Sequence, residues 1–416
     1  MAYLRRLWSI LGPGLLLAGA AVGVSHLVQA TRAGADYGFA LWWVLLFAVL
    51  TKYPFLEFGP RYAAATGETL LHGYRRLGPW PFRIFIFITV GTMFVIQAAV
   101  TIVTAGLAEQ VFQLGLSPLI WCLILLSTCV FLLLLGRYRA LDQVMKVIVS
   151  LLALATLVAV VLAFSTTAPT EVTDPPDYWN AAGLAFIIAL IGWLPIPLDA
   201  SVWHSIWHRT RDHQSDHPTT LAEARTGFNI GYFVAAALGF LFFFLGALIM
   251  FGSGQEFAGD SVQFSAQLAG LYAVALGDWS RSFVLIAALC AMFSTTLAVS
   301  DAFPRVLSHI WLHTEASDLE EPPPRIYNMG LFAVPFGALI ILTQLADAFT
   351  TLVDFAAALS FLSAPFLAYF NYRLITAPHV PSEARPSRPY AIFSLICLAS
   401  LSLFAAAYLL WLFVAP

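Results

Sequence analysis

The stretch "GPGLLLAGAAVGVSHLVQATRAGADYG" (residues 12–38) begins as an apolar helix and is interrupted halfway by Gly23, Ser25 and His26. Polar and ionisable groups are costly in the hydrocarbon core of a bilayer, and irregular backbone is tolerated there only where it lines a cavity. If this run spans a membrane, its interruption therefore predicts a functional site.

The composition identifies an α-helical membrane protein. The chain has 416 residues, of which 60% are hydrophobic and 10% charged, and its mean hydropathy is +0.83. Soluble domains carry about 25% charged residues. Several apolar runs reach the roughly 20 residues that cross a bilayer as a helix, whereas an outer-membrane barrel has shorter, alternating segments. No basic patch suggests a nucleic-acid partner, so the bilayer is the expected partner.

Eleven transmembrane spans are expected from these runs. Their predicted ranges are 11–31, 39–62, 83–112, 117–136, 143–165, 181–207, 226–252, 278–304, 327–346, 350–373 and 389–413.

The distribution of charge predicts the orientation. Seventeen of the 20 Lys and Arg residues lie before span one or around every second loop after it, whereas the opposite loops are acidic. Cytoplasmic loops carry the excess of Lys and Arg. The N-terminus is therefore expected in the cytoplasm and the C-terminus outside, in a multi-pass protein of a bacterial plasma (inner) membrane.

A second interruption lies in span six, "FIIALIGWLPIPLDASVWHSIWHRTR". Pro195 and Pro197 each remove a backbone donor, and Asp199 and His204 follow them. Interrupted spans at corresponding positions of two halves are typical of inverted-repeat transporters. We expect one transmembrane domain over residues 1–416, with repeats at 11–165 (spans one to five) and 181–373 (six to ten), and 389–413 as an eleventh helix.

The chain resembles the Nramp family of divalent-metal transporters, which have a LeuT-like fold. The resemblance extends over almost the whole chain. It includes "GPGLLLAGAAVG…RAGADYGFALWWVLL", "RYAAATGETL", "VWHSIWHRTR", "NIGYFVAAAL" and "ALSFLSAPFLAY". It implies a 5+5 inverted repeat with broken helices one and six, and transport of metal ions.

Three family motifs differ in this chain. The family's Asp-Pro-Gly-Asn in span one is replaced by Gly23-Val24-Ser25-His26, so a glycine stands at the metal-binding carboxylate. The Met-Pro-His of span six has no methionine here. The acidic pair of span three is missing, and Gln97 is the strong polar group in that part.

The predicted ion or substrate site comprises Gly23, Ser25, His26, Pro197 and Asp199. His26 and Asp199 each follow a break, and carboxylate with imidazole is a plausible ligand set for Zn²⁺, Mn²⁺ or Fe²⁺. Two alternatives stay open: Asp199 caps the restarted half-helix, and His26 is a hydrogen-bonded core residue.

Five further residues are expected in proton movement or gating: His204, Gln97, Asp354, Lys52 and Glu57. Imidazole suits proton transfer near neutral pH, although His204 could instead serve helix packing. Asp354 is read as a gate or a helix cap. Lys52 is expected to pair with Glu57 or Asp354. The other interpretation is that Lys52 takes the place of a bound cation.

Three other side chains receive simpler interpretations. Asp301 and Arg305 are four residues apart and should form a salt bridge. The Thr295 hydroxyl either coordinates a hard ion or bonds back to its helix. His208, next to Arg209, is read as a solvated residue at a helix end.

The sequence therefore predicts a secondary transporter of divalent metal ions working by alternating access, with protons as an open choice of coupling ion. A small organic or anionic solute is the alternative cargo. No nucleophile–base pair or phosphate-binding glycine loop indicates an enzyme, and no cofactor is expected beyond the transported ion.

Overall fold

The computed structural model describes residues 22–136, 139–166, 177–213, 219–314, 322–346 and 348–414. These ranges are helical and contain no strand, which confirms the all-α prediction. The elements are η1 (Ser25–Ala30), α2 (Thr31–Tyr37), α3 (Trp42–Thr66), α4 (Leu70–Leu77), α5 (Pro79–Phe112), α6 (Pro118–Leu135), α7 (Arg139–Thr166), α8 (Ala181–Trp193), α9 (Ala200–His213), α10 (Leu221–Ile249), α11 (Ser261–Leu276), α12 (Ser280–Thr314), α13 (Pro324–Leu345), α14 (Phe349–Ile375), η2 (Ser382–Ala384) and α15 (Arg388–Val414).

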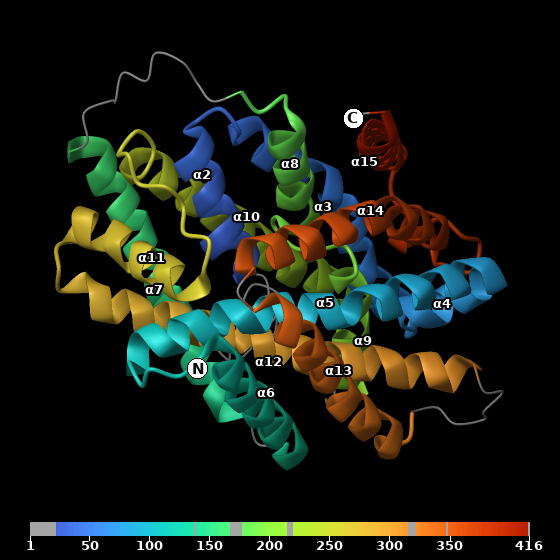
Figure 1. Ribbon diagram of the computed structural model, residues 1–416. Coiled ribbons are helices and arrows are strands. Elements are labelled where there is room, and N and C mark those ends of the chain that lie inside the picture. The colour runs from blue at the N-terminus through green and yellow to red at the C-terminus, as the bar shows by residue number, and fades with distance from the viewer. Residues whose placement is uncertain are drawn as a thin grey trace, which may run out of the picture.

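In the described ranges, eight helices are long and apolar enough to cross a membrane. Helices α5 and α12 pack against each other and cross the middle of the molecule, while α15 lies at its edge (Figure 1). Large apolar side chains are exposed on the peripheral helices, for example Phe131, Leu154, Phe336 and Leu403. These surfaces suit contact with lipid, as a multi-pass membrane protein requires.

Both predicted breaks are present. The first half of span one lies outside the described residues, but Val22 and Gly23 are non-helical and a π-helical turn, η1, begins at Ser25. Span six divides into α8 and α9, separated by residues 194–199. The Leu194 main chain is extended, which ends α8 at Trp193, and Pro195 and Pro197 have no N–H with which to continue it.

The region 253–277, read from the sequence as a loop, contains α11. Asp260 caps this helix, because its Oδ1 accepts from the N–H groups of Val262 and Gln263 at 3.0 and 2.9 Å. Helix α11 has 16 residues, too few for a span, and packs against α5, α7 and α12. Its apolar residues therefore bury against protein rather than cross the bilayer.

The helices next to the two breaks pack closely against their neighbours, α2 against α10 and α8 against α14. A Cβ on Gly34 of α2 would lie 2.0 Å from the Phe243 carbonyl oxygen, and one on Gly192 of α8 would lie 2.0 Å from the Ala357 carbonyl oxygen. Glycine at these positions lets α2 approach α10 and α8 approach α14 at backbone contact.

Candidate functional site

The two breaks open onto one small cavity of about 50 Å³. Gly23 and Ser25 line it from the first break, and Ile196 and Pro197 line it from the second. Thr295 of α12 also lines the cavity, and its hydroxyl donates to the carbonyls of Val22 and Ala291 at 3.3 and 3.1 Å. Three of the five residues of the predicted binding site, Gly23, Ser25 and Pro197, thus meet at one place.

Three tryptophans form much of the cavity wall, and sequence reasoning did not single them out. Trp193 ends α8, and Trp203 and Trp207 lie on α9. Trp203 and Trp207 are four residues apart and so share a helix face. That spacing directly after a broken span was a signal available in the sequence.

His26 is fully buried, and both of its ring nitrogens have partners. Nε2 lies 2.8 Å from the Ala235 carbonyl oxygen of α10, and Nδ1 lies 2.8 Å from Ser25 Oγ. A carbonyl only accepts, so Nε2 carries a proton, and in the neutral imidazole Nδ1 then accepts from the serine hydroxyl. His26 therefore joins η1 to α10, and a metal ion would have to replace the Ser25 hydrogen bond.

Asp199 directly precedes the first residue of α9, and the Val202 N–H donates to its main-chain carbonyl at 2.9 Å. This is the position of a helix cap, so the capping interpretation fits the local geometry. Its Oδ1 is nevertheless buried without a hydrogen-bond partner. Asp199 thus retains an unsatisfied acceptor beside the break.

Lys52 does not pair with Glu57 or Asp354, and that expectation was wrong. Its Nζ donates to the carbonyl oxygens of Gly192 and Ile196, at 3.1 and 2.9 Å, and its charge interacts with Asp199. Pro54 lies between Lys52 and Glu57, and α3 continues through this proline. The two side chains have separate partners.

Glu57 instead belongs to a separate cluster of charges, in which Glu57 and Arg61 are buried and Arg225 is about half exposed. Its Oε1 lies 3.2 Å from Nε of both Arg61 and Arg225, and the Tyr390 hydroxyl donates to Oε2 at 3.3 Å. This cluster joins α3, α10 and α15, so the contacts of Glu57 serve packing.

Gln97, His204 and His208 are buried. Gln97 donates to Thr101 at 3.2 Å and accepts from Ser300 of α12 at 3.3 Å. Neither ring nitrogen of His204 has a hydrogen-bond partner. His208 is 1% exposed with Nδ1 3.4 Å from Asp212 Oδ2, so the solvated interpretation of His208 was wrong. A proton role for His204 and Gln97 stays a prediction.

An ion-pair network joins α2 to α14 at one end of the molecule, which we name the gate end. Arg32 of α2 donates to Asp354 Oδ2 of α14 at 2.8 Å and to Asp36 at 3.2 Å, and Gln29 donates to Asp354 Oδ1 at 3.0 Å. Asp354 lies five residues into α14 and is not its cap, whose residue is Ala348. The gate interpretation of Asp354 fits this geometry.

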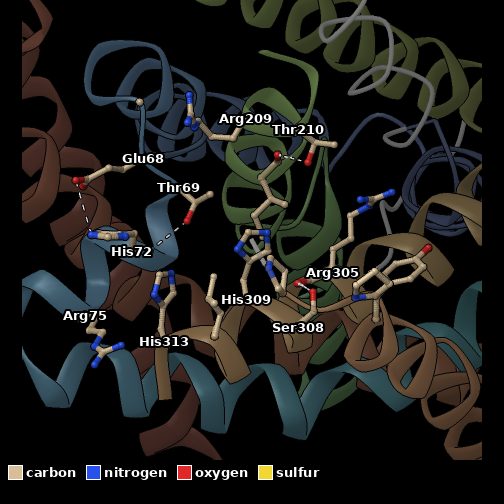
Figure 2. Close-up of a pocket in the computed structure, with 16 residues that line it drawn as sticks. Glu68, Thr69, His72, Arg75, Arg209, Thr210, Arg305, Ser308, His309 and His313 are labelled. Atoms are coloured by element: carbon tan, nitrogen blue, oxygen red, sulfur yellow. Dashed lines mark hydrogen bonds and ion pairs between the residues drawn. The ribbon is translucent and has the colours of Figure 1, made fainter. Parts of the chain in front are cut away.

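The opposite end, the vestibule end, holds an open pocket of about 720 Å³ (Figure 2). Helix α3 runs from the gate end to the vestibule end. It starts at Trp42, shortly after α2 ends at Tyr37, and Gly67, the residue after its last one, lines the pocket. Figure 2 shows polar side chains around the pocket: Glu68, Thr69, His72, Arg75, Arg209, Thr210, Arg305, Ser308, His309 and His313.

Trp207 lies between the cavity and this vestibule. Its Nε1 donates to Asp301 at 3.2 Å, and the same carboxylate accepts from Arg305 at 2.6 Å, as the spacing predicted, and from Tyr327 at 2.7 Å. Trp207 lines the cavity and Arg305 lines the vestibule. Asp301 therefore connects a residue of the cavity wall, Trp207, to two residues of the vestibule wall, Arg305 and Tyr327.

Within the described part of the chain, no group of three or more His, Cys, Asp and Glu side chains could hold a metal ion. A metal at the breaks would depend on carbonyl and hydroxyl oxygens with at most one carboxylate, Asp199. Mg²⁺, Ca²⁺ and Mn²⁺ prefer oxygen ligands of this kind, whereas Zn²⁺ and copper ions favour nitrogen and sulfur ligands.

Two broken helices around a central cavity, with a closed network at one end and a vestibule at the other, define a secondary transporter with the LeuT-like fold. Residues 14–412 match the Nramp family, described as natural resistance-associated macrophage protein-like. The chain belongs to this family, whose members are membrane transporters and not enzymes.

A relative from Pasteurella multocida (strain Pm70), the uncharacterized protein PM0681, is 34% identical over 377 residues, which are 88% of this chain and 85% of that protein. Among solved structures, the Eremococcus coleocola manganese transporter has a TM-score of 0.73 at 14% identity, covering 97% of this chain and 87% of its own. MhsT in complex with L-phenylalanine has a TM-score of 0.65 at 13% identity, covering 95% and 98%. These structures share the fold with this chain.

Proposed function

We propose that this protein transports divalent metal ions by alternating access, with the cargo bound between the two helix breaks. The observation that carries the proposal is the cavity lined from both breaks at once by Gly23, Ser25, Ile196 and Pro197. A volume of about 50 Å³ suits a small ion, because cavities that bind drug-sized ligands measure about 300–1,000 Å³. Family membership and the manganese transporter of the same fold support this cargo.

The transport cycle follows from the two barriers. The Arg32–Asp354 network must separate for cargo to enter from the gate end, and Trp207 must move away from Asp301 for cargo to leave through the vestibule. Each barrier joins different helices, so one can open while the other stays closed.

The vestibule end is proposed to face the cytoplasm of a bacterial inner membrane. Arg75, Arg209 and Arg305 line the vestibule, and Lys and Arg accumulate on the cytoplasmic side of membrane proteins. The N-terminus would then be cytoplasmic and the C-terminus extracytoplasmic. Protons are the proposed coupling ion, with His204 as the carrier.

The cavity lining favours a second candidate cargo, a small organic or anionic solute. Trp193, Trp203 and Trp207 provide apolar ring surface, and none of the lining residues is ionisable. A metal ion stripped of water needs charged or strongly polar ligands, whereas an organic solute gains from contact with aromatic surface.

Calorimetry with Mn²⁺, Zn²⁺, Mg²⁺ and Ca²⁺, combined with uptake into proteoliposomes, tests the proposal. We expect at least one ion to bind below millimolar concentration and to be taken up. Asp199→Asn, which keeps the shape and removes the charge, should weaken binding, whereas the surface control Asp278→Asn should not. Absence of binding and uptake for all four ions would refute metal transport and favour the organic solute.

Proton coupling needs its own measurement. Metal uptake should acidify the liposome lumen, and His204→Ala should abolish acidification while the protein still binds metal. Uptake driven by voltage with no change of luminal pH would contradict the proton proposal alone.

A further inference from the structure

The ammonium group of Lys52 lies where the backbone of span six offers acceptors for a cation. Lys52 is 0% exposed, and its Nζ donates to the carbonyl oxygens of Gly192 at 3.1 Å and Ile196 at 2.9 Å. Gly192 is in the last turn of α8, where carbonyls lose their helical partners and the helix dipole is negative. The two carbonyls therefore belong to one break and converge on one charge.

Asp199 supplies the anionic charge of the same region. It interacts electrostatically with Lys52, and its buried Oδ1 has no hydrogen-bond partner. An isolated carboxylate at this depth would be costly, so a positive charge close to it offsets that cost. The two carbonyl oxygens accept directly from the ammonium group, and the carboxylate adds a negative charge that acts on it electrostatically. Carbonyl and carboxylate oxygens are the ligand types that bind small hard cations.

The other acidic side chains of the surrounding helices have partners elsewhere. Glu57, on the same helix α3 and close to α10 and α15, is held by Arg61, Arg225 and Tyr390. Asp354 of α14 is held by Arg32 and Gln29. Lys52 is therefore directed at the break and Asp199.

We propose that Lys52 is a tethered cation: its ammonium group fills a cation site formed by the α8–α9 break and neutralises Asp199. The chain thereby supplies at this position a charge that would otherwise come from a bound ion. Lys52 is then a specificity-determining residue, because a cargo cation can use Asp199 and the break carbonyls only against its repulsion. The effect on cargo specificity rests on the proposed function, whereas the occupation of the cation site by the Lys52 ammonium does not.

The first experiment measures thermal unfolding of the purified full chain in Na⁺, K⁺, methylammonium or the bulky N-methyl-D-glucamine cation. The wild-type midpoint should be the same in all four salts at equal ionic strength. Lys52→Ala should lower the midpoint by several degrees in N-methyl-D-glucamine and recover part of the loss as Na⁺, K⁺ or methylammonium is titrated in. Lys146→Met, which removes the other lysine of the chain, is the control and should show no dependence on the cation.

A second variant pair tests the neutralisation of Asp199. Lys52→Met removes the charge but keeps the length, and should unfold at a lower temperature than wild type. Adding Asp199→Asn to it should raise the midpoint again, because no buried charge is then left unpaired. Asp278→Asn added to Lys52→Met is the matched control and should not raise the midpoint.

Two results would overturn the inference: Lys52→Ala with one midpoint in all four cations, or a double variant no more stable than Lys52→Met. Failure of every Lys52 variant to give a monodisperse protein in any cation would also overturn it, because the proposal requires a free cation to replace the ammonium. A further measurement determines the affinity for metal ions, which should be at least several-fold higher in Lys52→Met than in the wild type. If no variant binds metal, the proposed cargo is wrong, while the unfolding results still decide the tethered cation.

Discussion

Opening of the gate end can be predicted quantitatively from the contacts of Asp354. This residue accepts from Arg32 of α2 at 2.8 Å and from Gln29 of η1 at 3.0 Å, so both contacts link the segment after the first break to α14. Asp354→Ala removes both, while Arg32 retains Asp36 on its own helix. We therefore expect the variant to populate the state open at the gate end more often than the wild type.

The free energy lost in Asp354→Ala can be estimated from the exposure of the Arg32 and Asp354 side chains. Buried charge-assisted hydrogen bonds contribute about 1.5–3 kcal/mol, whereas exposed ion pairs contribute less than about 1 kcal/mol. The Arg32 and Asp354 side chains are 22% and 29% exposed, between these limits. A loss of about 1–2 kcal/mol raises the ratio of open to closed molecules about 5- to 30-fold.

The assay is the labelling rate of Thr295→Cys, a position in the cavity wall, by a membrane-impermeant thiol reagent on intact cells. Asp354→Ala should raise this rate by about the same 5- to 30-fold. The chain without Thr295→Cys measures the background from its native cysteines.

The matched control is Asp278→Ala. Asp278 pairs with Arg281 three residues away, so its loss changes charge without separating two helices. An unchanged rate in Asp354→Ala, or an equal increase in Asp278→Ala, would refute the gate.

Three further predictions concern packing. Glu57→Gln should lower the free energy of unfolding by about 3 kcal/mol in chemical denaturation, because it leaves the 4%-exposed Arg61 with an unpaired buried charge. Gly23→Ala should abolish uptake, since its Cβ would lie 2.9 Å from two side-chain atoms of Thr295, and Thr295→Ala added to it should restore uptake. Gly192→Ala should prevent folding, seen as loss of the monodisperse peak, because its Cβ would lie 2.0 Å from a carbonyl oxygen of α14.

Gly91→Ala is the control for both glycine variants, because no atom lies within 4 Å of its added Cβ. Normal uptake by Gly23→Ala, or a stable Gly192→Ala protein, would contradict the packing described for the two breaks. Wild-type stability of Glu57→Gln would show that Arg61 finds another partner.

Much of the fold was predictable because its signals are local. Long apolar runs, the prolines at 195 and 197 and the glycine at 23 act on neighbouring backbone, so they located the helices and both breaks. The Asp301–Arg305 contact was equally predictable, because helix geometry brings residues four apart together. Helix α11 was missed because its 16 residues are too few to span a bilayer, and only its neighbours bury it.

The partners of the buried charges were decided by the tertiary structure alone. Lys52 contacts carbonyls 140 and 144 residues away, and Arg32 contacts Asp354 over 322 residues. The sequence indicated that a buried lysine needs a partner, and Glu57 and Asp354 were both candidates. The choice among them depends on how helices α3, α8 and α14 pack, because close packing fixes which groups come within hydrogen-bond distance.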